Sequence, residues 1–291
     1  PESQQAGRGC SAVMTARAAS VAGLLLCWLA LLLLSLALRP LLPVDETRYL
    51  AVAWEMWWRG DFLLPWLNGE PYSHKPPLLF WLIHALWALF GVSELTARVL
   101  PVVFSLLSLW GAARLAQRLW PQQAAGIGVL VPWLLLGGVF WNNFFSLLQF
   151  DLLLVLAALL AWHGLLTARH RPLGGWPLVA LGIGLGVLAK GPVGLLLPLG
   201  IALLTLAVDG ELGRWRRFAP FTGPLLFALV CGAWVAAATL WGPAEYSVWG
   251  ALKEHFVDRG IHGMHHAQPW WYYAKVLPAQ LLPWTFLVPG A

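Results

Sequence analysis

Three acidic side chains lie at the edges of long apolar segments, where a carboxylate can take part in a reaction. Asp45 and Glu46 open a run whose apolar residues recur at helical spacing, and Asp151 lies within the apolar segment 144–154. An ionisable residue inside such a segment costs a few kcal/mol, so by default it marks a functional site. A carboxylate at this position can accept a proton from a hydroxyl group. Two structural interpretations stay open: a helix N-cap for Asp45, and a salt bridge or a water-lined helix end for Asp151.

Basic side chains accompany these acids in the polar segments and at a turn. They are Arg48, Lys75, Lys190 and Arg259. Lys190 lies at the helix-breaking sequence Lys190-Gly191-Pro192. A functional role and simple snorkelling of the side chain to the membrane interface explain a lysine at this position equally well. Arginine and lysine are the donors that phosphate prefers, and transfer from a phosphate-linked donor needs its leaving charge neutralised. The acids and bases together therefore predict group transfer from a lipid phosphate.

Histidines are concentrated near the end of the chain. His255, His262, His265 and His266 fall within twelve residues, close to Glu254 and Asp258. The spacing is a loose metal motif without an HExxH pattern, and a histidine- and arginine-containing loop facing lipid headgroups is the favoured interpretation. The following aromatic residues, 270–273, are typical of a membrane-interface belt.

The composition places all of these residues in a membrane protein. Of 291 residues, 59% are hydrophobic and 11% are charged, against about a quarter charged in an ordinary soluble domain. A soluble enzyme, a disordered chain and a nucleic-acid binder are excluded, because so little charge cannot cover a soluble surface. The fold predicted is an all-α, polytopic transmembrane helix bundle.

The predicted spans follow from runs of about 20 apolar residues. They are 20–38, 98–118, 124–141, 146–167, 176–190, 192–208 and 218–241, followed by an incomplete run at 276–291. The segment 76–91 is short and starts with prolines, so we expect a re-entrant or interfacial helix. Residues 1–19 are an N-terminal tail in which Met14 is a possible true start, and we expect the chain to be truncated at its C-terminus.

Orientation follows from the basic residues of short loops. Four clusters can all be cytoplasmic only if 76–91 does not cross: Arg17; Arg114 and Arg118; Arg169 and Arg171; and Arg214, Arg216 and Arg217. The polar segments 43–75, 142–151 and 242–275 then share the outer face with Lys190. The sequence therefore predicts that its chemically capable residues converge on one side of the membrane.

At these residues the chain resembles the polyprenyl-phosphate-dependent glycosyltransferases of the GT-C fold. This group includes the aminoarabinose transferases that modify lipid A and, more distantly, the protein O-mannosyltransferases. The resemblance runs from about residue 43 to 284 and rests on Asp45-Glu46, Tyr72 to Leu78, Gly91 to Arg98, Leu188 to Val193, and Glu254 to Arg259 with Pro283-Trp284.

The resemblance implies a transmembrane glycosyltransferase domain over 20–291, with outer loops 43–97 and 242–275 and juxtamembrane helices in the first of them. Asp45, with Glu46 beside it, and Asp151 would be the catalytic acids. Lys75 and Arg259 would bind the donor phosphate, with Lys190, Arg48 and Tyr72 as further substrate-binding residues. The donor would be a sugar on undecaprenyl phosphate, and the acceptor lipid A or another envelope glycan, lipid or protein. The reaction would take place at the periplasmic face of the bacterial inner membrane.

No cofactor is expected for catalysis, but the resemblance implies a possible structural zinc site. Its ligands here would be His74, where the aminoarabinose transferases have a glutamate, and His255. Two other classes stay open. One is a transporter or flippase with an Asp151–Lys190 relay, for which no inverted repeat is visible. The other is a membrane scaffold or metal sensor that uses the histidine loop.

Overall fold

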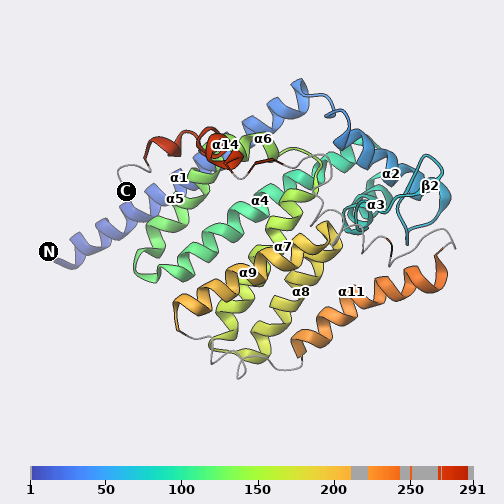
Figure 1. Cartoon of the computed structure of the whole chain (residues 1–291). Coiled ribbons are helices and arrows are strands. Elements are labelled where there is room, and N and C mark those ends of the chain that lie inside the picture. Colours follow the sequence, from blue (N-terminus) through green and yellow to red (C-terminus); the bar gives the residue numbers. More distant parts are fainter. Residues whose placement is uncertain (1, 211–221, 243–249, 251–267, 270, 288–291) are drawn as a thin grey trace.

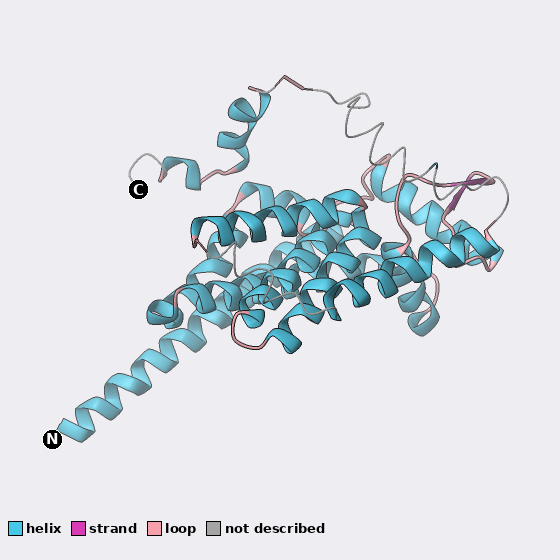
Figure 2. Cartoon of the chain, turned by 60° about the horizontal axis from the view of Figure 1, so that its bottom comes forward, coloured by secondary structure: helices cyan, strands magenta, loops and turns pink. Residues whose placement is uncertain are grey.

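The computed structural model describes residues 2–210, 222–242, 250, 268–269 and 271–287. These residues form an all-α bundle with one small two-stranded hairpin, which confirms the predicted fold class (Figure 1). Among the described helices, four are long and apolar enough to cross a membrane: residues 17–38 of α1 (Glu2–Leu38), α4 (Glu94–Leu119), α7 (Phe150–Ala168) and α8 (Pro172–Lys190). The N-terminal part of α1 extends beyond the other helices (Figure 2).

Further apolar helices run alongside these spans. They are α5 (Ala124–Gly137), which follows the 3-10 turn η1 (Pro121–Gln123), α9 (Pro192–Val208) and α11 (Thr222–Trp241). The helices α7 and α8 approach each other so closely that a Cβ atom on Gly182 would lie 2.6 Å from the carbonyl oxygen of Ala157. Small residues allow such close backbone contact between membrane helices.

One end of the bundle, which we call the loop end, carries α2 (Asp45–Arg59), β1 (Trp66–Leu67), β2 (Glu70–Pro71) and α3 (Leu78–Phe90) (Figure 1). After α3, Ser93 caps α4 by accepting a hydrogen bond from the amide of Thr96 at 3.1 Å. The Arg98 guanidinium then donates to the carbonyl of Arg39, just after α1, at 3.0 Å. Since α3 begins and ends at the loop end, segment 76–91 does not cross the bundle, as predicted.

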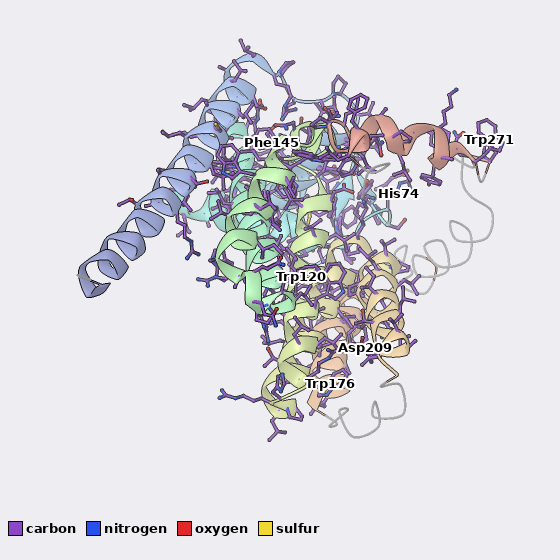
Figure 3. All side chains as sticks on the ribbon, turned by 90° about the vertical axis from the view of Figure 1, so that its left-hand side faces the viewer. His74, Trp120, Phe145, Trp176, Asp209 and Trp271 are labelled. Carbon is purple, nitrogen blue, oxygen red and sulfur yellow. The ribbon has the colours of Figure 1, made fainter. Side chains whose placement is uncertain are left out.

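The opposite end, which we call the basic end, holds the described arginines of the predicted clusters. Arg118 at the end of α4 donates to the carbonyl of His163 and to the hydroxyl of Thr167 on α7, each at 3.0 Å. Figure 3 shows Trp176 and Asp209 toward this end, and His74 and Phe145 toward the loop end. Arg214, Arg216 and Arg217 lie outside the described residues.

The prediction of one continuous span over 124–141 is wrong. The helix α5 ends at Gly137, the backbone is extended at Gly138, and the short helix α6 (Val139–Phe144) follows. The Asn142 side chain donates to the carbonyls of Leu136 at 2.6 Å and of Gly138 at 3.0 Å, at the break. The indole of Trp284 donates to the Leu134 carbonyl at 2.9 Å.

Two further segments differ from their predicted bounds. The segment 146–149 is not helical, and α7 begins at Phe150. The run 276–291 does not start a span within its described part, where α14 (Tyr272–Gln280) and the 3-10 turn η4 (Trp284–Phe286) are separated by Pro283. Proline cannot donate the backbone hydrogen bond that would continue the helix.

The first loop is a compact unit rather than a free connection. An Asn68-Gly69 turn with positive φ at both residues joins β1 to β2, as expected for a two-residue hairpin. The Asp61 carboxylate accepts hydrogen bonds from the amide of Leu63 at 3.0 Å and from the Trp66 indole at 2.7 Å. The Trp234 indole of α11 donates to the Leu63 carbonyl at 3.1 Å and ties the loop to the bundle.

Candidate functional site

Asp45 begins α2 and directs its carboxylate toward another segment. The side chain is 46% exposed; it lies 3.9 Å from the Arg48 guanidinium and accepts a hydrogen bond from the Gln149 amide at 3.4 Å. The N-cap position belongs to Val44, and no side chain caps the helix. The interpretation of Asp45 as an N-cap is therefore wrong, and its carboxylate is accessible for other contacts.

Asp151 and Lys190 form an ion pair. The Lys190 ammonium, in the last turn of α8, donates to the Asp151 carboxylate, in the first turn of α7, at 2.6 Å. The Asp151 side chain is 47% exposed and that of Lys190 is 28% exposed. The salt bridge considered from the sequence is thus present, and both groups keep an accessible surface at the loop end.

Tyr49 and Phe150 lie at the centre of the predicted site residues. The two rings pack edge to face with centroids 4.9 Å apart. Burial raises the pKa of the Tyr49 phenol, and the neighbouring charges of Asp45, Tyr72 and Asp151 raise it further. Tyr49 thus packs against the residue that directly precedes Asp151.

Lys75 reaches the same place from the first loop. Its ammonium lies 5.6 Å from the ring centroid of Phe150, the residue directly before Asp151 in the chain. Tyr72 is buried, and its backbone amide donates to the Pro65 carbonyl at 2.8 Å, which fixes the segment leading to Lys75. The structure thus brings together six predicted residues, which we call the site cluster: Asp45, Arg48, Tyr72, Lys75, Asp151 and Lys190.

Of the two predicted metal ligands, the structure describes His74 but not His255. His74 is exposed and its ring stacks at a tilt beside Tyr72, with centroids 5.2 Å apart. Within the described part of the chain, no three histidine, cysteine, aspartate or glutamate side chains gather as a metal site would need. His255 and Arg259 lie outside the described residues.

Glu46, which is predicted to be a catalytic acid beside Asp45, is enclosed by the protein. Its side chain is fully buried and accepts hydrogen bonds from the amides of Leu42 and Leu148, each at 2.7 Å, and from both terminal nitrogens of Arg39. Burial opposes ionisation, but these hydrogen bonds outweigh it and lower the pKa of Glu46. Each carboxylate oxygen of Glu46 therefore already accepts two hydrogen bonds, which hold the group as a buried anion.

Sequence reasoning missed three contributors to this region: Arg39, Tyr49 and Gln149. The signal that could have singled out Arg39 is its position directly after the first span, since a charge there needs a partner. Gln149, two residues before Asp151 in an apolar run, was a comparable signal. Nothing in the sequence singled out Tyr49 from the other aromatic residues of its helix.

The site cluster can bind an anion and accept a proton at neighbouring positions. Two half-exposed carboxylates lie among the cations Arg48, Lys75 and Lys190 at one end of a membrane bundle. Ammonium and guanidinium groups stabilise phosphate oxygens, and a carboxylate accepts the proton of a hydroxyl. Their position at the end of apolar helices suits a ligand with a polar head and a lipid tail.

The fold matches solved structures closely over almost the whole chain. The crystal structure of ArnT from Cupriavidus metallidurans bound to undecaprenyl phosphate superposes with a TM-score of 0.79, at 22% identity, over 94% of this chain and 50% of that one. The apo structure of the same protein gives a TM-score of 0.73. The chain is thus a multi-pass membrane protein with the GT-C fold.

A family model identifies the chain more closely. The model described as dolichyl-phosphate-mannose-protein mannosyltransferase matches residues 74–237, more than half of the chain. The chain belongs to this family.

Named relatives match most of this chain. An undecaprenyl phosphate-alpha-4-amino-4-deoxy-L-arabinose arabinosyl transferase of Pseudomonas aeruginosa PAO1 is 31% identical over 252 residues, covering 85% of this chain and 45% of the relative. The corresponding transferase 1 of Pseudomonas fluorescens Pf0-1 is 31% identical over 279 residues, covering 93% and 48%. The chain therefore spans about half the length of these relatives.

Proposed function

We propose that the full-length protein is a membrane glycosyltransferase that moves a sugar from a polyprenyl-phosphate donor to an envelope acceptor. The observation that carries this proposal is the convergence of Asp45, Lys75 and the Asp151–Lys190 pair at the loop end. The family membership and the names of the relatives favour undecaprenyl phosphate as the lipid carrier and 4-amino-4-deoxy-L-arabinose as the sugar. Lipid A is the acceptor that we propose first, with other glycans, lipids and proteins as alternatives.

In the proposed reaction, cations hold the donor phosphate. Lys75, with Arg259 from the segment outside the described residues, binds the phosphate oxygens and stabilises the charge that develops as the sugar leaves. Arg48 and Tyr72 border the same space and contribute to binding. The bond between the sugar C1 and the phosphate oxygen breaks, and its electron pair departs with the polyprenyl phosphate.

The acceptor oxygen forms the new bond to C1. Where the acceptor is a hydroxyl group, its proton passes to the Asp45 carboxylate, which is half-exposed and accepts a weak hydrogen bond from Gln149. Where the acceptor is a lipid phosphate, no proton has to be removed and Asp45 orients the acceptor. Asp151, held by Lys190, positions the sugar.

We propose that the loop end faces the periplasm and that the membrane is the bacterial inner membrane. The support is the segregation of Arg17, Arg118 and Arg169 to the basic end, since basic residues of short loops favour the cytoplasmic side. A donor on undecaprenyl phosphate would then present its head group to the site cluster from the outer leaflet.

A structural zinc ion between His74 and His255 also remains a proposal. Of these two ligands only His74 is described, and the described residues around it do not by themselves supply a zinc coordination set. No step of the proposed reaction passes through the ion.

The experiment that tests the function is transfer of labelled sugar from a synthetic undecaprenyl-phosphate donor to lipid A by the purified full-length protein. Formation of labelled lipid A supports the proposal. Uptake of a labelled solute into proteoliposomes without any transfer product would instead favour the transporter alternative, in which Asp151 and Lys190 form a relay.

A further inference from the structure

The buried carboxylate of Glu46 joins separate segments of the chain at the loop end. One oxygen accepts a hydrogen bond from the amide of Leu42, between α1 and α2, at 2.7 Å. The other accepts from the amide of Leu148, which lies 102 residues further along the chain, also at 2.7 Å. Asp45 is the neighbour of Glu46, and Asp151 follows Leu148 by three residues, so the same carboxylate joins the two segments that carry the acids of the site cluster.

Arg39 extends this connection to the end of α1. Its guanidinium holds Glu46 with both terminal nitrogens and also donates to the carbonyl of Ser146 at 3.0 Å. The Ser146 hydroxyl is 2.6 Å from that of Ser35 on α1. Arg98 of α4 in turn donates to the Arg39 carbonyl at 3.0 Å. The non-helical segment 146–149 is therefore anchored to α1 and α2 at several points.

The turn before Asp45 depends on the same contacts. Val44 has a φ of 75°, which a β-branched residue adopts only under strain. Such a conformation persists where the surrounding contacts impose it. The hydrogen bond from Leu42 to Glu46 closes the turn around Val44.

We propose that Glu46 is a positioning residue for the transfer reaction: it fixes Asp45 and the start of α7, and hence Asp151, at the separation that the reaction requires. This inference rests on the proposed function. It replaces the catalytic role predicted for Glu46, because the buried carboxylate touches backbone amides and Arg39 rather than the accessible face of the site cluster.

The test compares Glu46→Gln with a destabilised control in the full-length protein. The glutamine has the same size, but it replaces one acceptor oxygen with a donor facing a backbone N–H. The control is Leu165→Ala, which removes a buried side chain from α7 toward the basic end. Three quantities are measured for each: the thermal midpoint, the Kd for undecaprenyl phosphate, and kcat for transfer. Hydrogen exchange at the amides of Leu42 and Leu148 gives a readout that does not depend on activity.

We expect Glu46→Gln to lower kcat about tenfold or more, because small displacements of reacting groups are costly. The Kd should change less than about threefold, since binding uses Lys75 and Arg259. The two amides should exchange faster in Glu46→Gln alone, whereas Leu165→Ala should lower the thermal midpoint with kcat preserved. Glu46→Asp should not restore kcat, because the shorter side chain cannot span both amides.

Two results would overturn the positioning role while leaving the proposed function intact. The first is a wild-type kcat in Glu46→Gln. The second is a loss of kcat in Glu46→Gln that is no greater than the loss in Leu165→Ala when the two variants have the same thermal midpoint. Unchanged protection of both amides would overturn the contact network itself. A wild-type protein that transfers no sugar would instead overturn the proposed function, and exchange at Leu42 and Leu148 would still report the contacts of Glu46.

Discussion

The Asp151–Lys190 pair allows stability and function to be separated by a matched comparison. Its Nζ–Oδ1 distance is 2.6 Å, with side chains 47% and 28% exposed. At the basic end, Arg169 and Asp209 form a pair of the same 2.6 Å length with side chains 30% and 40% exposed. The two pairs have the same length and comparable exposure, but only the first belongs to the site cluster.

The expected stability effect is small and similar for both pairs. Exposed ion pairs contribute about 0.2–1 kcal/mol and charged hydrogen bonds about 1.5–3 kcal/mol, so a half-exposed pair should contribute about 1 kcal/mol. That energy changes the folding equilibrium about fivefold. Double-mutant cycles with Asp151→Asn and Lys190→Met, and with Arg169→Met and Asp209→Asn, should therefore give coupling energies of about this size.

The effect on transfer should differ between the two pairs. We expect Asp151→Asn and Lys190→Met each to lower kcat/KM roughly 10- to 100-fold, because the sugar loses its orienting group. The double variant should be no worse than the poorer single variant, since the two residues act as a unit. The assays are thermal unfolding in detergent and transfer of labelled sugar by the full-length protein. Equal losses of transfer at both pairs, or normal transfer in Asp151→Asn, would refute the assignment.

Further predictions concern packing, orientation and pH. Gly194→Ala should unfold the α8–α9 hairpin, because its Cβ would lie 2.0 Å from backbone of α8, whereas Gly200→Ala has nothing within 4 Å and should preserve the thermal midpoint. In cells, a membrane-impermeant thiol reagent should label Glu70→Cys but not Gln122→Cys; the reverse pattern would invert the proposed orientation. The lowered pKa of Glu46 means that its ionised form stabilises the fold above the usual glutamate pKa of 4.5 and that this contribution is lost as the pH falls further. The thermal midpoints of the wild type and Glu46→Gln should therefore converge at acid pH, and a constant gap would contradict the buried-anion account.

The sequence was sufficient for the features that depend on local pattern. Helical spacing placed α2 directly at Asp45, and the distribution of arginines predicted that α3 stays at the loop end. The same argument predicted that Asp151 and Lys190 share one end of the bundle, which their contact confirms. These inferences needed only periodicity, segment length and the sign of charges.

The features that sequence reasoning missed depend on contacts between distant segments. The role of Glu46 is decided by an amide 102 residues away, which no local pattern reveals. The break after α5 is stabilised by the indole of Trp284, 150 residues from the carbonyl it binds. The N-cap interpretation of Asp45 was reasonable for a carboxylate at a helix start, but the fold directs that side chain to Gln149 instead.

The most direct test of the central claim is the turnover of Asp45→Asn in the full-length protein, measured beside its affinity for undecaprenyl phosphate. Transfer is followed from a labelled undecaprenyl-phosphate sugar to a hydroxyl acceptor. We expect turnover to fall about 100-fold or more while the Kd changes less than about threefold, because the carboxylate accepts the proton and the cations bind the phosphate. Wild-type turnover in Asp45→Asn would contradict the account.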